Sequence, residues 1–279
     1  MEQLALAMVL KKIDELPSLP VVTSEVINLI ENPEISAQQV SESISKDQVL
    51  TGKILKMVNS AYYGLPRKVA TLTEAVTILG MDTLRTLTIG FSAYRTFSYG
   101  PGVKGLTTNQ VLQHSLACAG AAKAISQRIG YQMAEQAFLA GLLHDIGKMV
   151  LVNFLKEEYT QVIEKTNAEE KNLVMAEVEV LGLDHAQLGK MLAEKWNLPD
   201  ILIAPIANHH KPDRNSEHLL ITQIVHLANA LAVTAGYGMG NDRDYFLDMR
   251  TLDDVKLSFE DIMGMVPEVR GYVSTDLLI

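Results

Sequence analysis

Apolar residues recur along this chain at intervals of three and four, the spacing of one face of an α-helix, rather than at the interval of two expected of a strand. Residues that can cap a helix stand at several predicted starts. In four places such a residue is followed three positions later by Glu or Gln, a pairing that satisfies free amide donors: Ser36 with Gln39, Thr71 with Glu74, Asn167 with Glu170, and Asp184 with Gln187. The pattern predicts an all-α protein.

A break near the middle of the chain divides these helices into two lobes. Residues 98–102 contain two glycines and a proline, which favour a turn over a continuing helix. We therefore expect an N-terminal helical lobe at residues 1–105, a second helical bundle at 106–237 and a C-terminal helical appendage at 238–279. The helices before the break are apolar on more than one side and need neighbours, so we expect the lobes to be parts of one unit.

Composition narrows the function classes. The 279 residues are 48% apolar and 20% charged, as in folded globular proteins, and the net charge is −9 without a dense Lys/Arg cluster, which argues against binding to duplex nucleic acid. Cys118 is the single cysteine, so the chain can form neither an intrachain disulfide nor a cysteine-based zinc site. No run reaches the roughly 18–20 apolar residues of a membrane span. We expect a cytoplasmic protein without membrane contact.

The histidines are unevenly distributed. All seven lie in the second lobe, at positions 114, 144, 185, 209, 210, 218 and 226. The pair His144-Asp145 lies at the edge of an apolar stripe, between Phe138 and Met149, that we interpret as one buried helix. Polar groups near a core are costly unless they are paired. An imidazole beside a carboxylate therefore indicates mutual hydrogen bonding or a shared cation.

Further candidate ligands come from separate predicted helices. They are His114, His185, His209 and His210, and His226 lies one helical turn from Asn229, so those two would face the same way. Imidazole and carboxylate donors without a thiolate suit Fe, Mn, Zn, Co or Ni better than Ca or Mg. We interpret His218 as a surface residue, and Cys118 and Trp196 as core residues.

The sequence resembles the HDOD domains of bacterial signalling proteins, which are relatives of the HD metal-dependent phosphohydrolases. The resemblance covers roughly residues 10–235. It rests on six segments and a His pair: Leu16-Pro17-Ser18-Leu19-Pro20, the run 58–64 (VNSAYYG), the run 75–80 (AVTILG), the run 141–148 (GLLHDIGK), the run 181–185 (LGLDH) with Gly189, Trp196-Asn197-Leu198-Pro199, and His209-His210. It implies an all-helical fold, an HD-like second lobe and a role in signal output.

The resemblance also implies ligand positions. In active HD enzymes a first His, the His-Asp doublet and a later Asp hold one metal, and these positions resemble His114, His144, Asp145 and Asn229. Asn is neutral where a carboxylate would bind, so metal affinity should fall. Related HD-GYP phosphodiesterases add ligands that resemble Glu177, His185, His209 and His210, with a phosphate-contacting lysine at Lys148. The Gly-Tyr-Pro triplet is missing after His210, which argues against cyclic-di-GMP hydrolysis in particular.

Three functions fit these features. The favoured one is a regulatory module in which signalling proteins or a small nucleotide-like ligand bind the first lobe, at or near residues 59–64, while a metal only braces the second lobe. Tyr62 and Tyr63 in that segment have an alternative interpretation as inward-packing residues. The oligomeric state stays open.

The second function is a metal-dependent phosphohydrolase acting on a nucleotide or phosphodiester, with Fe or Mn favoured over Zn and with two ions as one option. Its metal ligands would be His114, His144, Asp145, His185, His209 and His210, and its catalytic residues Asp145 and Lys148. The third is a helical scaffold that holds no metal, in which the histidines hydrogen-bond one another.

Overall fold

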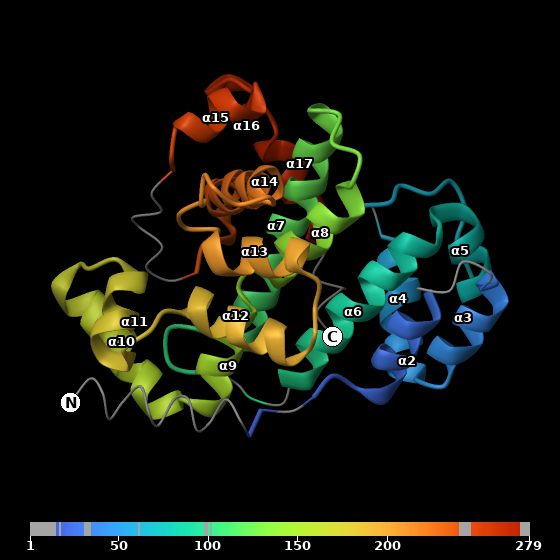
Figure 1. Ribbon diagram of the computed structural model, residues 1–279, viewed down its shortest axis with the longest axis horizontal. Helices are drawn as coiled ribbons and strands as arrows, with labels where there is room; N and C mark the ends of the chain where they lie inside the picture. The colour runs from blue at the N-terminus through green and yellow to red at the C-terminus, as the bar shows by residue number, and fades with distance from the viewer. Residues whose placement is uncertain are drawn as a thin grey trace.

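The computed structural model describes residues 15–16, 18–30, 35–60, 62–97, 100, 102–239 and 247–273, and the elements formed by these residues are helices. The prediction of an all-α fold is confirmed (Figure 1). The first group contains α2 (Val21–Ile30), α3 (Ala37–Ser45), α4 (Gln48–Val58), α5 (Leu72–Leu79) and α6 (Met81–Phe97). The second contains α7 (Thr108–Arg128), α8 (Ala134–Leu143), α9 (Ile146–Phe154), α10 (Lys156–Glu169), α11 (Leu173–Leu181), α12 (His185–Lys195), α13 (Asp200–Asn208), α14 (Leu219–Ala232) and the π-helical turn η1 (Val233–Tyr237). The last contains α15 (Arg250–Val255), α16 (Phe259–Gly264) and α17 (Val266–Tyr272).

Helix α6 joins the two lobes. It packs against α2 and α4 on one side and against α8 on the other, so it is buried around most of its circumference. Leu84, Leu87 and Phe91 belong to an apolar cluster that continues from the first lobe into the second. Figure 1 shows α2 to α5 gathered at one end of α6. The continuous core fits the expectation that the lobes form one unit, while the boundaries after residues 105 and 237 stay predictions.

Helices α7, α8 and α14 form the centre of the second lobe. Gly141 of α8 lies so close to α7 that a Cβ atom there would meet the Ala119 Cα and the Cys118 carbonyl oxygen at 3.0 Å each. Glycine therefore allows the two helices to approach closely. Helices α15 and α17 cover α14, where Leu252 and Val269 are buried.

Tyr62, within the segment at residues 59–64, packs between the first lobe and the rest of the protein. The Asn59 side chain donates to the carbonyl oxygen of Val69 (2.8 Å) and accepts from the Val69 amide (2.7 Å). These two hydrogen bonds hold together the ends of the connection between Asn59 and Val69. The Tyr62 ring packs on Phe138 and Tyr272, with centroids 5.4 and 5.0 Å away. The inward-packing interpretation of Tyr62 therefore fits the structure better than an open binding surface.

The predicted helix starts have mixed outcomes. Ser36, Thr71 and Asp184 cap their helices as predicted, each accepting a hydrogen bond from the amide three residues later. The start predicted at Asn167 is wrong, because this residue lies inside α10 and the next helix begins after Asn172, whose side chain accepts from the Val174 amide. Of the predicted break at 98–102, only residues 100 and 102 lie within the described part of the chain.

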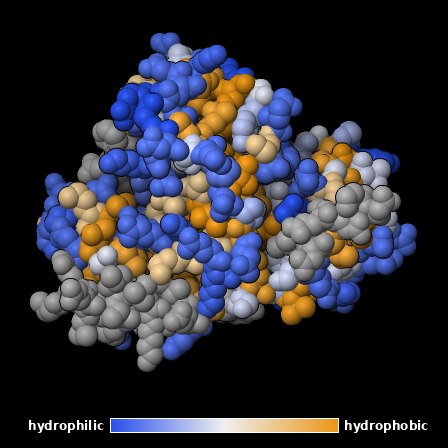
Figure 2. Space-filling model, viewed as in Figure 1, coloured by the Kyte–Doolittle hydropathy of each residue, from blue (hydrophilic) through white to orange (hydrophobic). Residues whose placement is uncertain are grey.

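Two helical stretches are long and apolar enough to cross a membrane by composition, Ala134–Phe154 and Leu219–Tyr237. Their apolar windows are 89% and 67% buried inside the fold, as is usual for core helices. Figure 2 shows hydrophilic side chains over most of the described surface on one face, with smaller apolar groups between them. The apolar stretches are therefore accounted for by the protein interior.

Candidate metal centre

The Asp145 carboxylate lies between two groups of histidines. Its Oδ2 atom is 3.5 Å from His114 Nε2 and 3.2 Å from His144 Nε2. Its Oδ1 atom is 3.2 Å from His185 Nε2 and 3.6 Å from His209 Nε2. His210 completes the second group, with its Nε2 atom 2.8 Å from that of His185. The structure thus brings together the six predicted ligands, which come from α7, α12 and the ends of α8 and α13.

The opposite edge of four of these rings is anchored. In each, Nδ1 donates to a carbonyl or carboxylate oxygen: His114 to Tyr237 O (2.9 Å), His144 to Gly141 O (2.7 Å), His209 to Ile206 O (3.0 Å) and His185 to Glu177 Oε2 (2.6 Å). A neutral imidazole that donates from Nδ1 keeps its lone pair on Nε2. If all four rings were neutral, four Nε2 lone pairs would point towards a carboxylate that also carries lone pairs, so protons or a metal cation are needed between them.

Protonation can supply this positive charge at only some of the rings. Burial opposes charge on His144, but the Asp145 carboxylate outweighs burial and holds the pKa of His144 well above its usual value. Burial also opposes charge on His185, but the Glu177 carboxylate outweighs it and raises the pKa of His185 to about 9. Burial and neighbouring imidazoles lower the pKa of His209 and His210 well below the usual value. The last two rings are therefore neutral at pH 7, the state that binds metals.

The donor set fits a divalent transition metal. The Asp145 Oδ1 atom is buried and receives no well-formed hydrogen bond from the described residues, although the Nε2 atoms of His185 and His209 lie 3.2 and 3.6 Å from it. Metal-binding histidines usually donate their second N–H to a carbonyl or carboxylate, as the rings here do. One ion could be held by His114, His144 and Asp145, and a second by His185, His209 and His210.

The His-Asp doublet lies at a helix break, which corrects the prediction of one continuous helix. Helix α8 ends at Leu143 and α9 begins at Ile146, with Asp145 at φ −100° and ψ 16° between them. On a regular helix, neighbouring side chains point about 100° apart. The break instead leaves His144 and Asp145 close together, with Nε2 and Oδ2 separated by 3.2 Å.

A glycine contact sets the distance between α9 and α12. A Cβ atom on Gly147 would lie 2.0 Å from the His185 carbonyl oxygen and 2.8 Å from the Gly189 amide nitrogen. Only a residue without a side chain allows this approach, which places His185 beside Asp145. Gly147 and Gly189 are positioning residues that sequence reasoning missed, although both lie in or beside the motifs that carry the family resemblance.

Two further residues hold the second histidine group from behind. Glu177 was expected among the ligands of related enzymes, but its Oε2 atom accepts from His185 Nδ1 and its Oε1 atom accepts from the Tyr159 hydroxyl (2.9 Å). Tyr159 is fully buried on α10. The arrangement makes Glu177 an anchor for the His185 ring rather than a direct donor.

Lys148 lies beside the Asp145 carboxylate, and two further polar residues, His226 and Asn229, are buried on α14. Lys148 is 2% exposed, and its Nζ atom lies 3.0 Å from Asp145 Oδ2. Together with His144 it lowers the pKa of Asp145 well below the usual value, against the effect of burial. His226 stands outside both groups, because its Nδ1 donates to the His209 carbonyl (2.7 Å) and its Nε2 accepts from the Asp248 amide (3.0 Å). Asn229 is buried on α14.

The chain is similar in sequence to several known proteins. It is 29% identical over 226 residues to an uncharacterized protein of Treponema pallidum (strain Nichols), a match that covers 80% of this chain and 43% of the relative. The chain spans less than half the length of the curated relatives it matches. The whole relatives therefore contain further sequence that this chain does not match.

Two crystal structures are similar over nearly the whole chain. An HDOD domain protein of unknown function from Geobacter sulfurreducens has a TM-score of 0.77 and 26% identity, covering 99% of this chain and 91% of that one. A candidate phosphohydrolase from Shewanella amazonensis SB2B has a TM-score of 0.73 and 27% identity, covering 94% and 92%. The HDOD domain family matches residues 16–212. This match spans well over half of the sequence, and the chain therefore belongs to the HDOD family.

Proposed function

We propose that this chain is a regulatory output module of bacterial signal transduction, in which a metal centre braces the second lobe and does not turn over a substrate. The observation that carries the proposal is the enclosure of the centre. Of the six candidate ligands, His114, His144, Asp145, His185 and His209 are each 0% exposed, and only His210 is partly exposed. A phosphorylated substrate would have to reach these donors, and five of the six are closed to it without a rearrangement.

Two residues support a bracing role. Asn229 stands where the resemblance places a carboxylate ligand, and a neutral amide contributes no charge to metal binding. Lys148 pairs with the Asp145 carboxylate inside the protein, which neutralises charge that a catalytic metal would otherwise use. Both features lower the reactivity expected of a bound ion.

The proposed ions are Fe or Mn in preference to Zn, one or two per chain. When bound, such an ion would supply positive charge to the Asp145 carboxylate and accept the imidazole lone pairs of the two histidine groups. The chain's own contribution is orientation, because the Gly141, Ile206 and Tyr237 carbonyls fix three of the rings. A centre that joins α7, α8, α12 and α13 in this way holds the bundle in one arrangement.

The partners proposed for the module are signalling proteins or a small nucleotide-like ligand, acting in the cytoplasm. The net charge of −9 supports neither duplex nucleic acid nor an anionic membrane surface as a partner. The packing of Tyr62 against Phe138 and Tyr272 moves the expected contact surface away from this side chain.

A metal-dependent phosphohydrolase is the second candidate, and one observation favours it. The two oxygens of Asp145 face different histidine groups, as a carboxylate shared by two ions would. Such ions supply an activated water and stabilise charge on a phosphoryl group. The candidate phosphohydrolase from Shewanella amazonensis shares the fold at 27% identity. In this alternative, Asp145 and Lys148 would be the catalytic side chains.

Metal content and turnover together separate these functions. Protein purified without chelators should carry about one to two equivalents of Fe or Mn by elemental analysis, and should hydrolyse no nucleotide or cyclic dinucleotide in a broad panel. Asp145→Asn should lose the metal, whereas His218→Asn, a histidine change outside both groups, should keep it.

Turnover that disappears in both Asp145→Asn and Lys148→Met would overturn the bracing role and establish the hydrolase. Full-length folded protein without bound metal after growth in Fe- and Mn-supplemented medium would instead favour the scaffold interpretation.

A further inference from the structure

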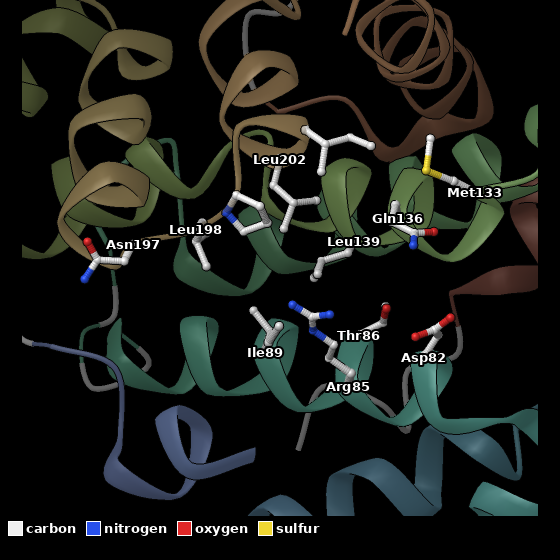
Figure 3. Close-up of a pocket in the computed structure, with 12 residues that line it drawn as sticks. Asp82, Arg85, Thr86, Ile89, Met133, Gln136, Leu139, Asn197, Leu198 and Leu202 are labelled. Carbon is white, nitrogen blue, oxygen red and sulfur yellow. The ribbon is translucent and has the colours of Figure 1, made fainter. Parts of the chain in front are cut away.

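A pocket of about 350 Å³ lies between the lobes, away from the metal centre. One wall is α6, which contributes Asp82, Arg85, Thr86 and Ile89, and the opposite wall comes from α8 and the start of α13. Figure 3 shows these two walls facing one another. The volume falls at the lower end of the range for small-molecule sites, about 300–1,000 Å³. None of its lining residues is a candidate metal ligand.

Arg85 is the first sign of a ligand. Its half-buried guanidinium reaches from α6 into the pocket towards Leu139 (Figure 3). It forms neither an ion pair nor a hydrogen bond with the described residues, whereas Arg95, ten positions later on the same helix, is paired with Asp47. A guanidinium has five N–H donors, and leaving them partly desolvated without an acceptor is costly.

Thr86 is the second sign. On the same helix Thr83 and Thr88 donate to the carbonyl oxygens of Leu79 and Leu84 (2.8 Å each). The Thr86 hydroxyl forms no corresponding bond within the described residues, although the residue is 4% exposed. Threonines inside helices commonly bond the carbonyl four residues back. The Thr86 hydroxyl is therefore available to a group inside the pocket, next to the Arg85 guanidinium.

The rest of the pocket is apolar. Ile89, Leu139, Leu198 and Leu202 are buried core residues that line it, so a bound molecule would rest its body on aliphatic side chains. Asp82 lies one helical turn before Arg85 and also lines the pocket. Its negative charge disfavours a polyanion. The combination suits one anionic group on a compact apolar body.

We propose that this pocket binds a small organic monoanion, whose charged group pairs with Arg85 and accepts from Thr86. The bound molecule bridges α6 of the first lobe to α8 and α13 of the second. Helix α8 ends just before His144-Asp145 and α13 just before His209-His210, so the pocket walls lead directly into the candidate metal centre. Binding here requires neither metal nor turnover, and its test is independent of the function proposed above.

The test uses the full chain with benzoate as the probe and benzyl alcohol as its neutral counterpart, measured by ligand-observed NMR titration. Phenyl phosphate forms a second arm, which distinguishes a phosphate head group from a carboxylate. Benzoate should bind more tightly than benzyl alcohol, and Arg85→Gln should weaken its binding about tenfold or more, as expected for a charge-assisted pair. Arg128→Gln, an exposed arginine on α7, serves as the matched control and should leave binding unchanged.

Phenyl phosphate carries close to two negative charges at pH 7, so Asp82 should make it bind more weakly than benzoate, and tighter binding of phenyl phosphate would overturn the assignment of a monoanion. The proposal is overturned if neither anion binds, if benzyl alcohol binds as well as benzoate, or if Arg85→Gln binds both probes like the parent protein. Circular dichroism establishes that Arg85→Gln is folded. Thr86→Val, which keeps the side-chain shape, should weaken anion binding by a smaller factor and provides a second test if the arginine variant does not fold.

Discussion

Among the described residues, the first lobe fully buries no charged side chain, whereas the second buries a carboxylate, an ammonium group and several imidazoles. The buried polar side chains on α3 and α6 include Ser41, Thr83 and Thr88, neutral hydroxyls that donate to carbonyls of their own helix. Around Asp145, in contrast, the rings are anchored by their Nδ1 atoms and their Nε2 atoms converge. The buried polar groups of the first lobe are thus paired within their own helices, whereas those around Asp145 form a cluster that could hold a metal ion.

This difference separates two ways of stabilising a helical bundle. Neutral hydroxyls bonded within a helix cost little, and the apolar core provides the stability. Moving a charged cluster out of water costs free energy, and the cluster stabilises the fold only when every charge in it has a partner. Removing one charged side chain from the cluster should therefore lower the free energy of unfolding more than a comparable substitution in the first lobe.

The largest effect is expected from Asp145→Ala. The change leaves the buried Lys148 ammonium and the protonated His144 and His185 rings without their shared carboxylate. Breaking a buried pair from one side typically costs about 3–5 kcal/mol. Urea denaturation should show a loss of this size in the free energy of unfolding, together with loss of bound metal. Stability like that of the parent protein would remove the contrast between the lobes.

Metal removal should have the next largest effect. If metal is present at 100 to 1,000 times its dissociation constant, its binding contributes about 2.7–4.1 kcal/mol to the stability of the folded state. Dialysis against EDTA should lower the melting temperature, and adding Mn²⁺ or Fe²⁺ should restore it. Hydrogen exchange should localise the loosening to the ends of α8 and α13. Uniform loosening of α3 and α4 as well would contradict a brace confined to the second lobe.

A pair of glycine substitutions sharpens the comparison. Gly147→Ala drives a Cβ atom into the His185 carbonyl oxygen and should cost about 1–3 kcal/mol or more, because α12 must move. Gly52→Ala in α4 meets no atom within 4 Å and should stabilise the protein by up to about 1 kcal/mol, the difference in helix propensity. In thermal denaturation, Gly147→Ala should lower the melting temperature and Gly52→Ala should raise it. Equal effects at the two positions would show that the α9–α12 contact is not close-packed in solution.

The sequence predicted the fold and the convergence of the ligands better than their local geometry. Apolar spacing and caps such as Ser36 and Asp184 depend on neighbours in sequence, so they could be assigned without a structure. Asn167 has the same local signal but lies inside α10, because packing of Val162 and Thr166 continues the helix past it. The break at Asp145 was missed for a similar reason, since an apolar stripe continues on both sides of it.

Features made by distant segments could not be predicted. The approach of Gly147 to His185 requires α9 and α12 to be placed, and the pocket around Arg85 combines residues from α6, α8 and the start of α13. The anchoring carbonyl of Tyr237 comes from a backbone atom that any residue type would supply. Side-chain identity carries no signal for such contacts.

The smallest effect is expected at the charge pair of the first lobe. Asp47 caps α4 and pairs with Arg95. Burial raises the pKa of this carboxyl, but the Leu50 amide and the Arg95 guanidinium outweigh burial, so the pKa is lowered. A lowered carboxyl pKa adds stability above the unfolded-state value of about 3.9, and this contribution disappears as the pH falls through the folded-state pKa. Asp47→Asn keeps a capping side chain while removing the charge, and should cost about 0.2–1 kcal/mol at pH 7. Denaturation of both proteins between pH 7 and pH 3 should show this difference shrinking as the pH falls, whereas a constant difference would mean that the charge on Asp47 does not stabilise the first lobe.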